Sequence, residues 1–194
     1  MRVIGGIAKG RRLKTARGWD IRPTSDYLKG VFFDILQRRV QDASFLDLFA
    51  GSGNVGIEAM SRGARSATFV DSSSQSMALI RMNAAAIGLQ DRAELMRSDV
   101  LKAIETMKNR GQRFSFIFID PPYRSGLLHS TLLSLSCHDL LSEEGMIVVE
   151  HFHKEQLPHH LPGLIWDREI RHGESKLSFY LKERSSGEKD IDPR

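Results

Sequence analysis

The chain is poor in cysteine and in long apolar runs. Of its 194 residues only Cys137 is a cysteine, so an intrachain disulfide is impossible. No apolar stretch approaches the roughly 20 residues of a membrane-spanning helix, and glycines stand where a signal peptide would have its apolar region. These absences predict a cytoplasmic protein, and the length of 194 residues predicts one domain with at most a small appendage. Cys137 lies in an apolar helical pattern and is expected to be a buried thiol.

Metal-binding patterns are scarce as well. Four histidines, at positions 151, 153, 159 and 160, lie close together around a proline, but their spacing is irregular and no cysteine accompanies them. Structural zinc sites use regularly spaced pairs of cysteine and histidine ligands. The sequence therefore predicts no metal site.

Positive charge is concentrated in one fifth of the chain. Residues 1–40 contain ten lysines and arginines against three aspartates, whereas the whole chain carries a net charge of only +4. A basic segment on a mildly acidic body favours a polyanionic partner over an ordinary solvated face. The candidate contacts to that partner are Lys9, Arg11, Arg12, Lys14 and Arg22.

From residue 45 onward, short apolar runs alternate with amphipathic segments. Strands are predicted at about 45–50, 66–71, 93–97, 114–119 and 145–150, and helices at about 54–63, 73–87, 100–109 and 126–141. This alternation predicts an α/β fold, with a mostly parallel sheet covered by helices on both faces. Two further runs, 164–171 and 176–183, flank a glycine turn. They predict a terminal antiparallel hairpin, which brings the sheet to seven strands.

A different pattern precedes this alternation. Residues 2–14 mix glycine, apolar and basic residues, which predicts a short hairpin that presents cations. A helix is expected after Thr24, a favourable N-cap, because apolar residues then recur at helical spacing. We therefore divide the chain into a basic hairpin and helix at 1–40, a main domain at 41–184 and a polar tail at 185–194 that is expected to be disordered.

The first predicted strand runs into a glycine-rich loop. Residues 51–56 match the pattern G-x-G-x-x-G, and Asp71 closes the next strand, where a ribose-binding carboxylate belongs. These features predict a nucleoside-containing cofactor. Asp47 at the loop would repel the pyrophosphate of a dinucleotide but would pair with the ammonium group of S-adenosylmethionine. Asp99, after the third strand, would accept a hydrogen bond from the adenine amine, cap the following helix, or do both.

The tetrapeptide Asp120-Pro121-Pro122-Tyr123 follows the apolar run at 114–119. Its two prolines fix the backbone as it leaves the strand, and hydrogen-bond acceptors then lie beside an aromatic ring. Such a pair of acceptors can hold the exocyclic amine of a planar base. Taken alone, however, the tetrapeptide is explained equally well as a proline turn that ends a strand.

Several segments together resemble a known family. The segments DLFAGSGNVGIEA, FVD, SDV and DPPY occur in the order and spacing of Rossmann-like S-adenosylmethionine methyltransferases. GGIAKGRRLK, IRPTSDYLKGVFFDIL and HGESKLSFYLKE resemble the bacterial small-subunit ribosomal RNA guanine-N2 methyltransferases, so that the similarity covers about residues 1–183. Two departures stand out. Asp71 occupies a position where the family more often has glutamate, and residues 27–31 carry less charge than the family's helix.

The resemblance implies transfer of a methyl group from S-adenosylmethionine to the N2 amine of a guanine in 16S ribosomal RNA. The expected partner is this RNA or the small ribosomal subunit. We expect the protein to act as a monomer, and we expect no membrane partner. The catalytic residues would be Asp120, Pro121, Pro122 and Tyr123, with the ring of Tyr123 stacked on the base. The cofactor would be bound by Asp47, Phe49, Ala50, Gly51, Gly53, Asp71, Ser72, Asp99 and Val100.

Three alternative functions remain open. A methyltransferase that acts on adenine N6 in DNA or RNA would use the same tetrapeptide, although no separate DNA-recognition domain is evident. An NAD-dependent oxidoreductase would use the glycine loop, but Asp47 opposes it. A non-catalytic RNA-binding module would need only the basic segment, and it leaves the cofactor acids unexplained.

Overall fold

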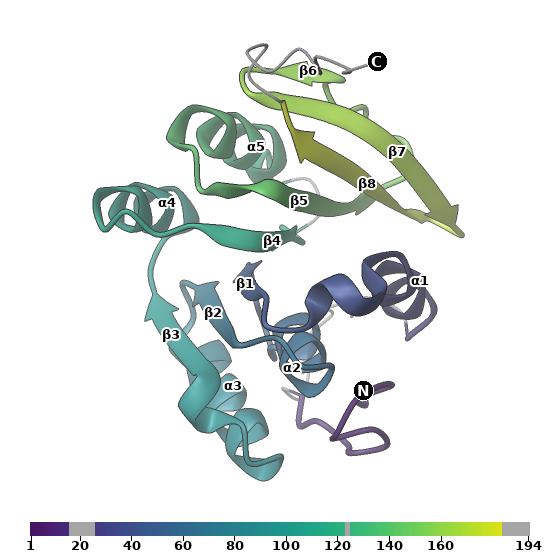
Figure 1. Ribbon diagram of the computed structural model, residues 1–194, viewed down its shortest axis with the longest axis vertical. Helices are drawn as coiled ribbons and strands as arrows, with labels where there is room; N and C mark the ends of the chain where they lie inside the picture. The colour runs from purple at the N-terminus through teal and green to yellow at the C-terminus, as the bar shows by residue number, and fades with distance from the viewer. Residues whose placement is uncertain (16–25, 123–124, 184–194) are drawn as a thin grey trace, which may run out of the picture.

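The computed structural model describes residues 1–15, 26–122 and 125–183, and an eight-stranded sheet forms its centre (Figure 1). The strands are β1 (Ser44–Leu48), β2 (Ser66–Asp71), β3 (Ala93–Arg97), β4 (Phe114–Ile119), β5 (Leu141–Phe152), β6 (His160–Leu161), β7 (Leu164–His172) and β8 (Ser175–Lys182). Their order is β3-β2-β1-β4-β5-β8-β7-β6. The first five in this order pair in parallel, and the last three add to the edge in antiparallel fashion. The prediction of a mostly parallel sheet with a terminal hairpin is confirmed.

The sheet differs from the prediction in two details. It has eight strands instead of seven, because the two residues of β6 pair with the start of β7. A strand of two residues is too short to show a period in the sequence. Strand β5 also begins at Leu141, four residues earlier than predicted, because Asp139 adopts a positive φ of 46° and separates the helix before it from the strand.

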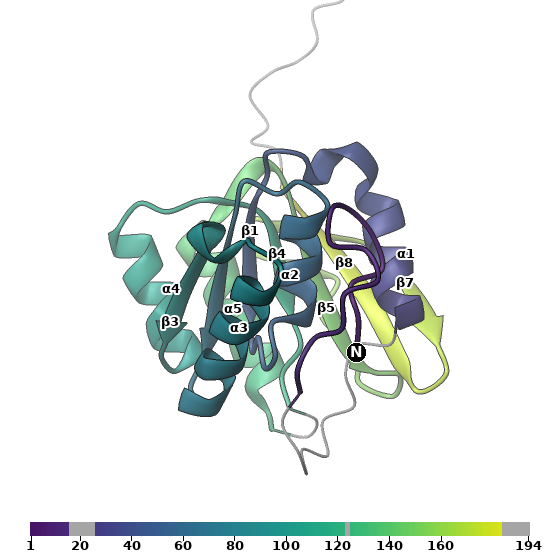
Figure 2. The ribbon, with the colours of Figure 1, turned by 90° about the horizontal axis from the view of Figure 1, so that it is seen from below.

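Helices cover both faces of the sheet, as predicted (Figures 1 and 2). On one face lie α1 (Asp26–Leu36), α2 (Asn54–Ser61) and α3 (Ser74–Ala86); on the other lie α4 (Val100–Asn109) and α5 (Leu127–His138); two 3-10 turns are η1 (Gln37–Val40) and η2 (Gln90–Arg92). Strand alternation divides the core accordingly. Phe116 and Phe118 pack with α1, whereas Ile117 and Ile119 pack with α4 and α5.

Cys137 corrects one expectation. It lies on α5 but is exposed, so the prediction of a buried thiol is wrong. The buried face of α5 is formed by Leu128, Thr131, Leu132 and Leu135. Cys137 follows Leu135 by two residues, which turns it away from that face.

The N-terminal arm, residues 1–15, folds back on itself in antiparallel fashion, as the sequence predicted. Arg2 and Arg12 form a bridge, the amide of Val3 donates to the carbonyl of Arg11 at 3.0 Å, and the amide of Leu13 donates to the carbonyl of Met1 at 3.2 Å. The arm also lies along α2 (Figure 2), where the amide of Ile7 donates to the carbonyl of Ser61 at 2.8 Å and the amide of Ala8 donates to the Ser61 hydroxyl at 3.0 Å. Contacts to a helix therefore add to the pairing within the arm.

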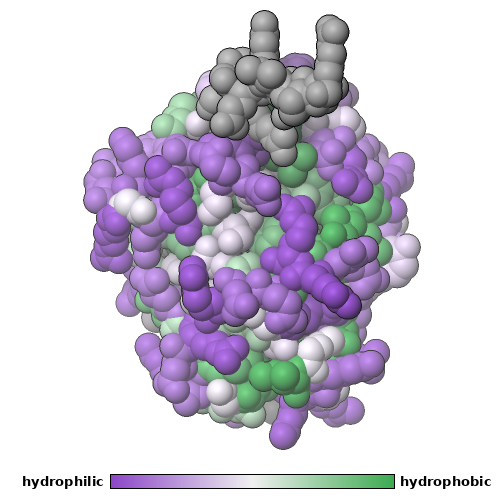
Figure 3. Space-filling model, in the orientation of Figure 1, coloured by the Kyte–Doolittle hydropathy of each residue, from purple (hydrophilic) through white to green (hydrophobic). Residues whose placement is uncertain are grey.

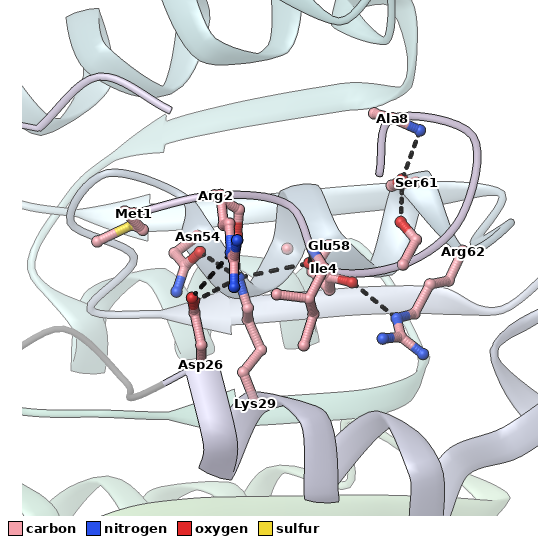
Figure 4. A network of polar contacts seen from close by, with 12 residues as sticks. Met1, Arg2, Ile4, Ala8, Asp26, Lys29, Asn54, Glu58, Ser61 and Arg62 are labelled. Carbon is pink, nitrogen blue, oxygen red and sulfur yellow. Dashed lines mark hydrogen bonds and ion pairs between the residues drawn. The ribbon is translucent and has the colours of Figure 1, made fainter. Parts of the chain in front are cut away.

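A buried ion pair fastens α1 and the arm to α2 (Figure 4). The ammonium group of Lys29, a residue with no exposed surface, lies 3.4 Å from a carboxylate oxygen of the equally buried Glu58. It also donates to the carbonyl of Arg2 and to Oδ1 of Asn54, both at 2.7 Å. Burial lowers the pKa of Lys29, an effect that the negative charge of Glu58 opposes. The carboxylate of Glu58 in turn accepts from the amide of Ile4 at 2.8 Å.

The face drawn in Figure 3 is largely hydrophilic, and hydrophobic residues on it form separate small areas. Over residues 1–15, 26–122 and 125–183, no helix is both long and apolar enough to cross a membrane.

The buried ion pair gives a stability prediction. Lys29→Met removes the cation and leaves the buried Glu58, among the residues that the structure describes, with only the guanidinium of Arg62, at 2.8 Å, as a charge partner. We expect the free energy of unfolding to fall by about 3 kcal/mol, because an uncompensated buried charge is costly. Urea denaturation measures this change, with Lys102→Met at an exposed position of α4 as the control. A loss within about 0.5 kcal/mol, the usual range for surface substitutions, would contradict the account.

Candidate active site

Four aspartates gather at one edge of the sheet. The chain runs from β1 outward to β2 and β3, and then returns to place β4 and β5 on the other side of β1. In such sheets ligands bind at the carboxyl ends of the strands, where the strand order reverses. Asp47 is the fourth residue of β1, Asp71 ends β2, Asp99 follows β3 and Asp120 follows β4. The structure thus brings these four predicted site residues to the same edge.

The glycine loop between β1 and α2 has an unusual backbone. Phe49, Gly51 and Gly53 all have positive φ angles, of 62°, 55° and 77°. A Cβ on Gly51 would meet nothing closer than 4.0 Å, whereas on Gly53 it would approach side chains at 3.1–3.2 Å and on Gly56 it would collide with Phe69 at 2.4 Å. Gly53 and Gly56 therefore permit close packing of helix on strand, and Gly51 leaves space that a ligand can enter.

Asp71 holds this loop in place. Its Oδ2 accepts from the amide of Gly51 at 2.9 Å, and its Oδ1 accepts from the amide of Ser73 at 2.8 Å. Asp71 is half-buried, and the neighbouring Ser72 is exposed. Ala50 is buried, and its amide donates to the carbonyl of Val70 at 3.0 Å. The predicted ribose ligand thus also joins the glycine loop to the end of β2.

Asp47 lies deeper than the sequence indicated. It is only 3% exposed, and its Oδ2 accepts from the amide of Gly56 at 2.8 Å. Burial raises the pKa of Asp47 to about 8, and the nearby Asp71 raises it further, although the hydrogen bond from Gly56 acts in the opposite direction. The observed role of Asp47 is to hold the first turn of α2 against β1. Its predicted contact with the ammonium group stays a prediction.

Asp99 is the N-cap of α4. Its Oδ1 accepts from the amides of Leu101, at 3.0 Å, and Lys102, at 3.2 Å, so the capping role that the sequence allowed is present. Oδ1 accepts both bonds, so Oδ2 of this exposed side chain takes part in neither. A second role, as acceptor for an adenine amine, is therefore compatible with the capping geometry. Val100, which follows it, is buried.

The donors and acceptors at this edge suit the cofactor predicted from the sequence. Asp71 and Asp99 supply acceptors, which ribose hydroxyls and an adenine amine require, and residues 47–56 contain no lysine or arginine to balance a pyrophosphate. Among the described residues, Nδ2 of Asn54 at the start of α2 is buried without a hydrogen-bond partner. A carboxylate at the methionine end would satisfy it. The sequence does not single out Asn54, because it occupies one of the unspecified positions of the pattern G-x-G-x-x-G.

The predicted catalytic turn leaves the sheet at Asp120, which is half-buried. Burial raises the pKa of Asp120 well above its usual range, and the carboxylates of Glu150 and Asp47 raise it further. Pro121 is buried and Pro122 exposed, and both line a small pocket together with Glu150. Tyr123 lies outside the described residues.

Glu150 is a site residue that sequence reasoning missed. It is 4% exposed and belongs to β5, whose Val149 pairs with Ile119 of β4, so Glu150 follows in register beside Asp120. The sequence feature that could have identified Glu150 is its position as an acidic residue directly after the apolar run 146–149.

The predicted RNA contacts lie on the outside of the arm. The side chains of Lys9, Arg11, Arg12 and Lys14 are all exposed. Arg22 lies outside the described residues. As for metals, no cluster of three or more potential ligands occurs in the part of the chain that the structure describes. His151, one of the four clustered histidines, is buried, with Nε2 2.8 Å from the hydroxyl of Ser178.

Known proteins match this chain over nearly its whole length. The family model Conserved hypothetical protein 95 matches residues 1–181. YlbH of Bacillus subtilis is 36% identical over 182 residues, which cover 94% of this chain and 99% of YlbH. Ribosomal RNA small subunit methyltransferase D of Escherichia coli is 32% identical over 192 residues, 99% of this chain and 94% of that protein. The solved structure of the Escherichia coli protein yhhF has a TM-score of 0.81 at 32% identity, covering 94% of this chain and 98% of that one.

The raised pKa of Asp47 gives a pH prediction. A folded-state pKa of about 8, above the unfolded value of 3.8, means that the folded protein holds a proton that the unfolded chain releases. This contribution to stability is complete below about pH 4 and is lost as the pH rises toward 8. Asp47→Asn retains an oxygen for the Gly56 amide but does not titrate. We therefore expect the cofactor-free variant to gain stability relative to wild type between pH 5 and 8, by about 3–4 kcal/mol, because each pH unit between the two pKa values contributes about 1.4 kcal/mol.

Thermal unfolding at a series of pH values measures this gain. Asp91→Asn, at an exposed position of η2, is the control and should follow the wild-type curve. Parallel curves for Asp47→Asn and wild type would show that Asp47 is ionised in the folded protein.

Proposed function

The chain belongs to the Conserved hypothetical protein 95 family, alongside small-subunit ribosomal RNA methyltransferase D, and from this membership we propose its reaction. It transfers the methyl group of S-adenosylmethionine to the exocyclic N2 amine of a guanine in small-subunit ribosomal RNA. The observation that carries the proposal is the position of Asp120-Pro121-Pro122. This turn begins where β4 ends, directly beside β1 and its glycine loop.

We infer that the glycine loop and the strand-end acids hold the cofactor. S-adenosylmethionine, when bound, supplies an electrophilic methyl group. Asp71 accepts from the ribose hydroxyls, Asp99 accepts from the adenine amine, and the open face of Gly51 allows close approach of the backbone. Asp47 holds the first turn of α2 through its hydrogen bond with the Gly56 amide, and in our proposal it lies near the amino-acid end of the cofactor. The remaining contacts of this set are Phe49, Ala50, Gly53, Ser72 and Val100.

The catalytic turn orients the amine. The lone pair of a guanine amine is delocalised into the ring, so the nitrogen is a poor nucleophile unless its geometry is fixed. In our proposal Asp120 and the carbonyl of Pro121 each accept an N–H, which directs the lone pair toward the methyl group, and Tyr123 stacks on the base. The raised pKa of Asp120 suits this carboxylate to take the proton that the methylated amine releases.

The basic N-terminal part provides the RNA contacts in this proposal. Residues 1–40 bind RNA, and Lys9, Arg11, Arg12 and Lys14 neutralise phosphates, together with Arg22. The target guanine must leave its stack to reach the turn, so an exposed or flipped nucleotide is the substrate. The protein acts as a monomer in the cytoplasm, on ribosomal RNA or on an assembling small subunit. The choice of guanine over adenine as the target base is the most specific part of the proposal, and it rests on the family resemblance.

The catalytic role of Asp120 is testable by substitution. We expect Asp120→Ala to reduce methyl transfer to unmodified small-subunit RNA by at least about 100-fold, the usual lower bound for a positioned acid or base. The assay uses labelled S-adenosylmethionine. Calorimetric binding of S-adenosylhomocysteine should remain within about twofold of wild type, so a loss of activity cannot be ascribed to a misfolded cofactor site. Full activity in this variant would refute the assignment.

The arm is testable by charge reversal. The double variant Arg11→Glu/Arg12→Glu should weaken RNA binding at least tenfold and reduce the slope of log K against log salt by about 1.4, because two phosphate contacts are lost. The matched control, Lys108→Glu/Arg110→Glu, changes the charge equally at the C-terminal end of α4, on the other face of the sheet. Equal salt dependence in both double variants would refute the role of the arm.

A further inference from the structure

Asn83 of α3 connects the arm to the glycine loop. It is 1% exposed, and its side-chain amide makes three hydrogen bonds to main-chain groups. Oδ1 accepts from the amide of Lys14 at 2.8 Å, and Nδ2 donates to the carbonyls of Lys14 and Ser52, both at 3.0 Å. Ser52 is the residue between Gly51 and Gly53. One side chain therefore fixes both the end of the arm and the centre of the loop.

A second connection lies on the other side of the same loop. The ammonium of Lys29 donates to the carbonyl of Arg2 in the arm and to Oδ1 of Asn54, the first residue of α2 (Figure 4). The hydroxyl of Ser52 also donates to the sulfur of Met1 at 3.2 Å. The segment 52–54 is thus held on both sides by groups that also hold the arm.

The arm needs these connections in addition to its own hydrogen bonds. Within the arm the amide of Val3 donates to the carbonyl of Arg11 and the amide of Leu13 donates to the carbonyl of Met1, but an isolated two-stranded hairpin is only marginally stable in water. The contacts with α2, α3 and Lys29 therefore contribute to its described order. Conversely, the loop places the non-glycine residue Phe49 at a positive φ of 62°, a strained conformation that the surrounding structure must hold in place. Arm and loop support each other through Asn83.

We propose that Asn83 is a positioning residue that couples RNA binding on the arm to cofactor binding at the glycine loop. RNA that neutralises the exposed cations of the arm stabilises the ordered arm, and the ordered arm holds Ser52 in the geometry that binds S-adenosylmethionine. Each ligand bears part of the ordering cost of the other. Binding linkage then requires that RNA raise cofactor affinity by the same factor by which the cofactor raises RNA affinity. This inference rests on the proposed function, because it needs RNA as a ligand.

The experiment measures this coupling factor. Calorimetry gives the affinity for S-adenosylhomocysteine with and without saturating small-subunit RNA transcript. We expect an increase of about tenfold in wild type, within the usual range of such couplings. Asn83→Ala should reduce the factor to below about twofold. Amide hydrogen exchange should agree: RNA alone should slow exchange at residues 50–54 in wild type and not in Asn83→Ala.

Two control variants separate coupling from charge and from stability. Lys14→Ala removes a cation but keeps the backbone groups that Asn83 binds, so RNA affinity should fall while the coupling factor persists. Met107→Ala destabilises the core on the other face of the sheet and should leave the factor unchanged. If Asn83→Ala does not fold, Asn83→Asp is used, which keeps the acceptor for the Lys14 amide and removes the donor to the carbonyls of Ser52 and Lys14.

The outcomes distinguish this inference from the proposed function. A factor of one in wild type, or an unchanged factor in the Asn83 variant, overturns the coupling even if RNA is methylated normally. Absence of any RNA binding or methyl transfer in wild type overturns the proposed function itself, and the inference with it.

Discussion

The buried pair of Lys29 and Glu58 is the interaction on which the arrangement of the functional parts depends. It joins α1, α2 and the arm, three segments that are separate in the sequence, at one buried point. A buried ion pair of this kind is not necessarily more stabilising than apolar residues packed in its place. It does, however, require that these particular charged groups come together, and so it favours one arrangement of the segments that carry them. Here it aligns the basic arm with the first turn of α2. The hydrogen bonds within the arm, such as the one from the Val3 amide to the Arg11 carbonyl, do not by themselves fix where the arm lies on the body.

The sheet supplies the second constraint. Because β1 to β5 are parallel, residues that follow each strand gather at one edge, and Asp71, Asp99 and Asp120 come from three different strand ends. Asp47 and Glu150 lie within strands and are nearly fully buried. Burial raises the pKa of Asp120, and the neighbouring carboxyl groups of Glu150 and Asp47 raise it further. In our proposal this raised pKa prepares the carboxylate of Asp120 to receive a proton.

Local periodicity in the sequence accounts for most of the fold. Runs such as Phe114–Ile119 have the length and composition of buried strands, and the glycine pattern marks the loop before α2. The position of the arm on the body could not be predicted in the same way, because its partners there are the side chains of Glu58, Ser61 and Asn83, more than 50 residues away. The burial of Asp47 and the exposure of Cys137 likewise depend on which neighbours pack against them, which a linear pattern does not record.

The central claim is that this site methylates the N2 amine of guanine. The most direct measurement is mass spectrometry of nucleosides from small-subunit RNA that has been incubated with the protein and S-adenosylmethionine carrying a deuterated methyl group. The account predicts the label in N2-methylguanosine, at a single nucleotide. Label in N6-methyladenosine, or no label in RNA from a protein that binds S-adenosylhomocysteine normally, would contradict it.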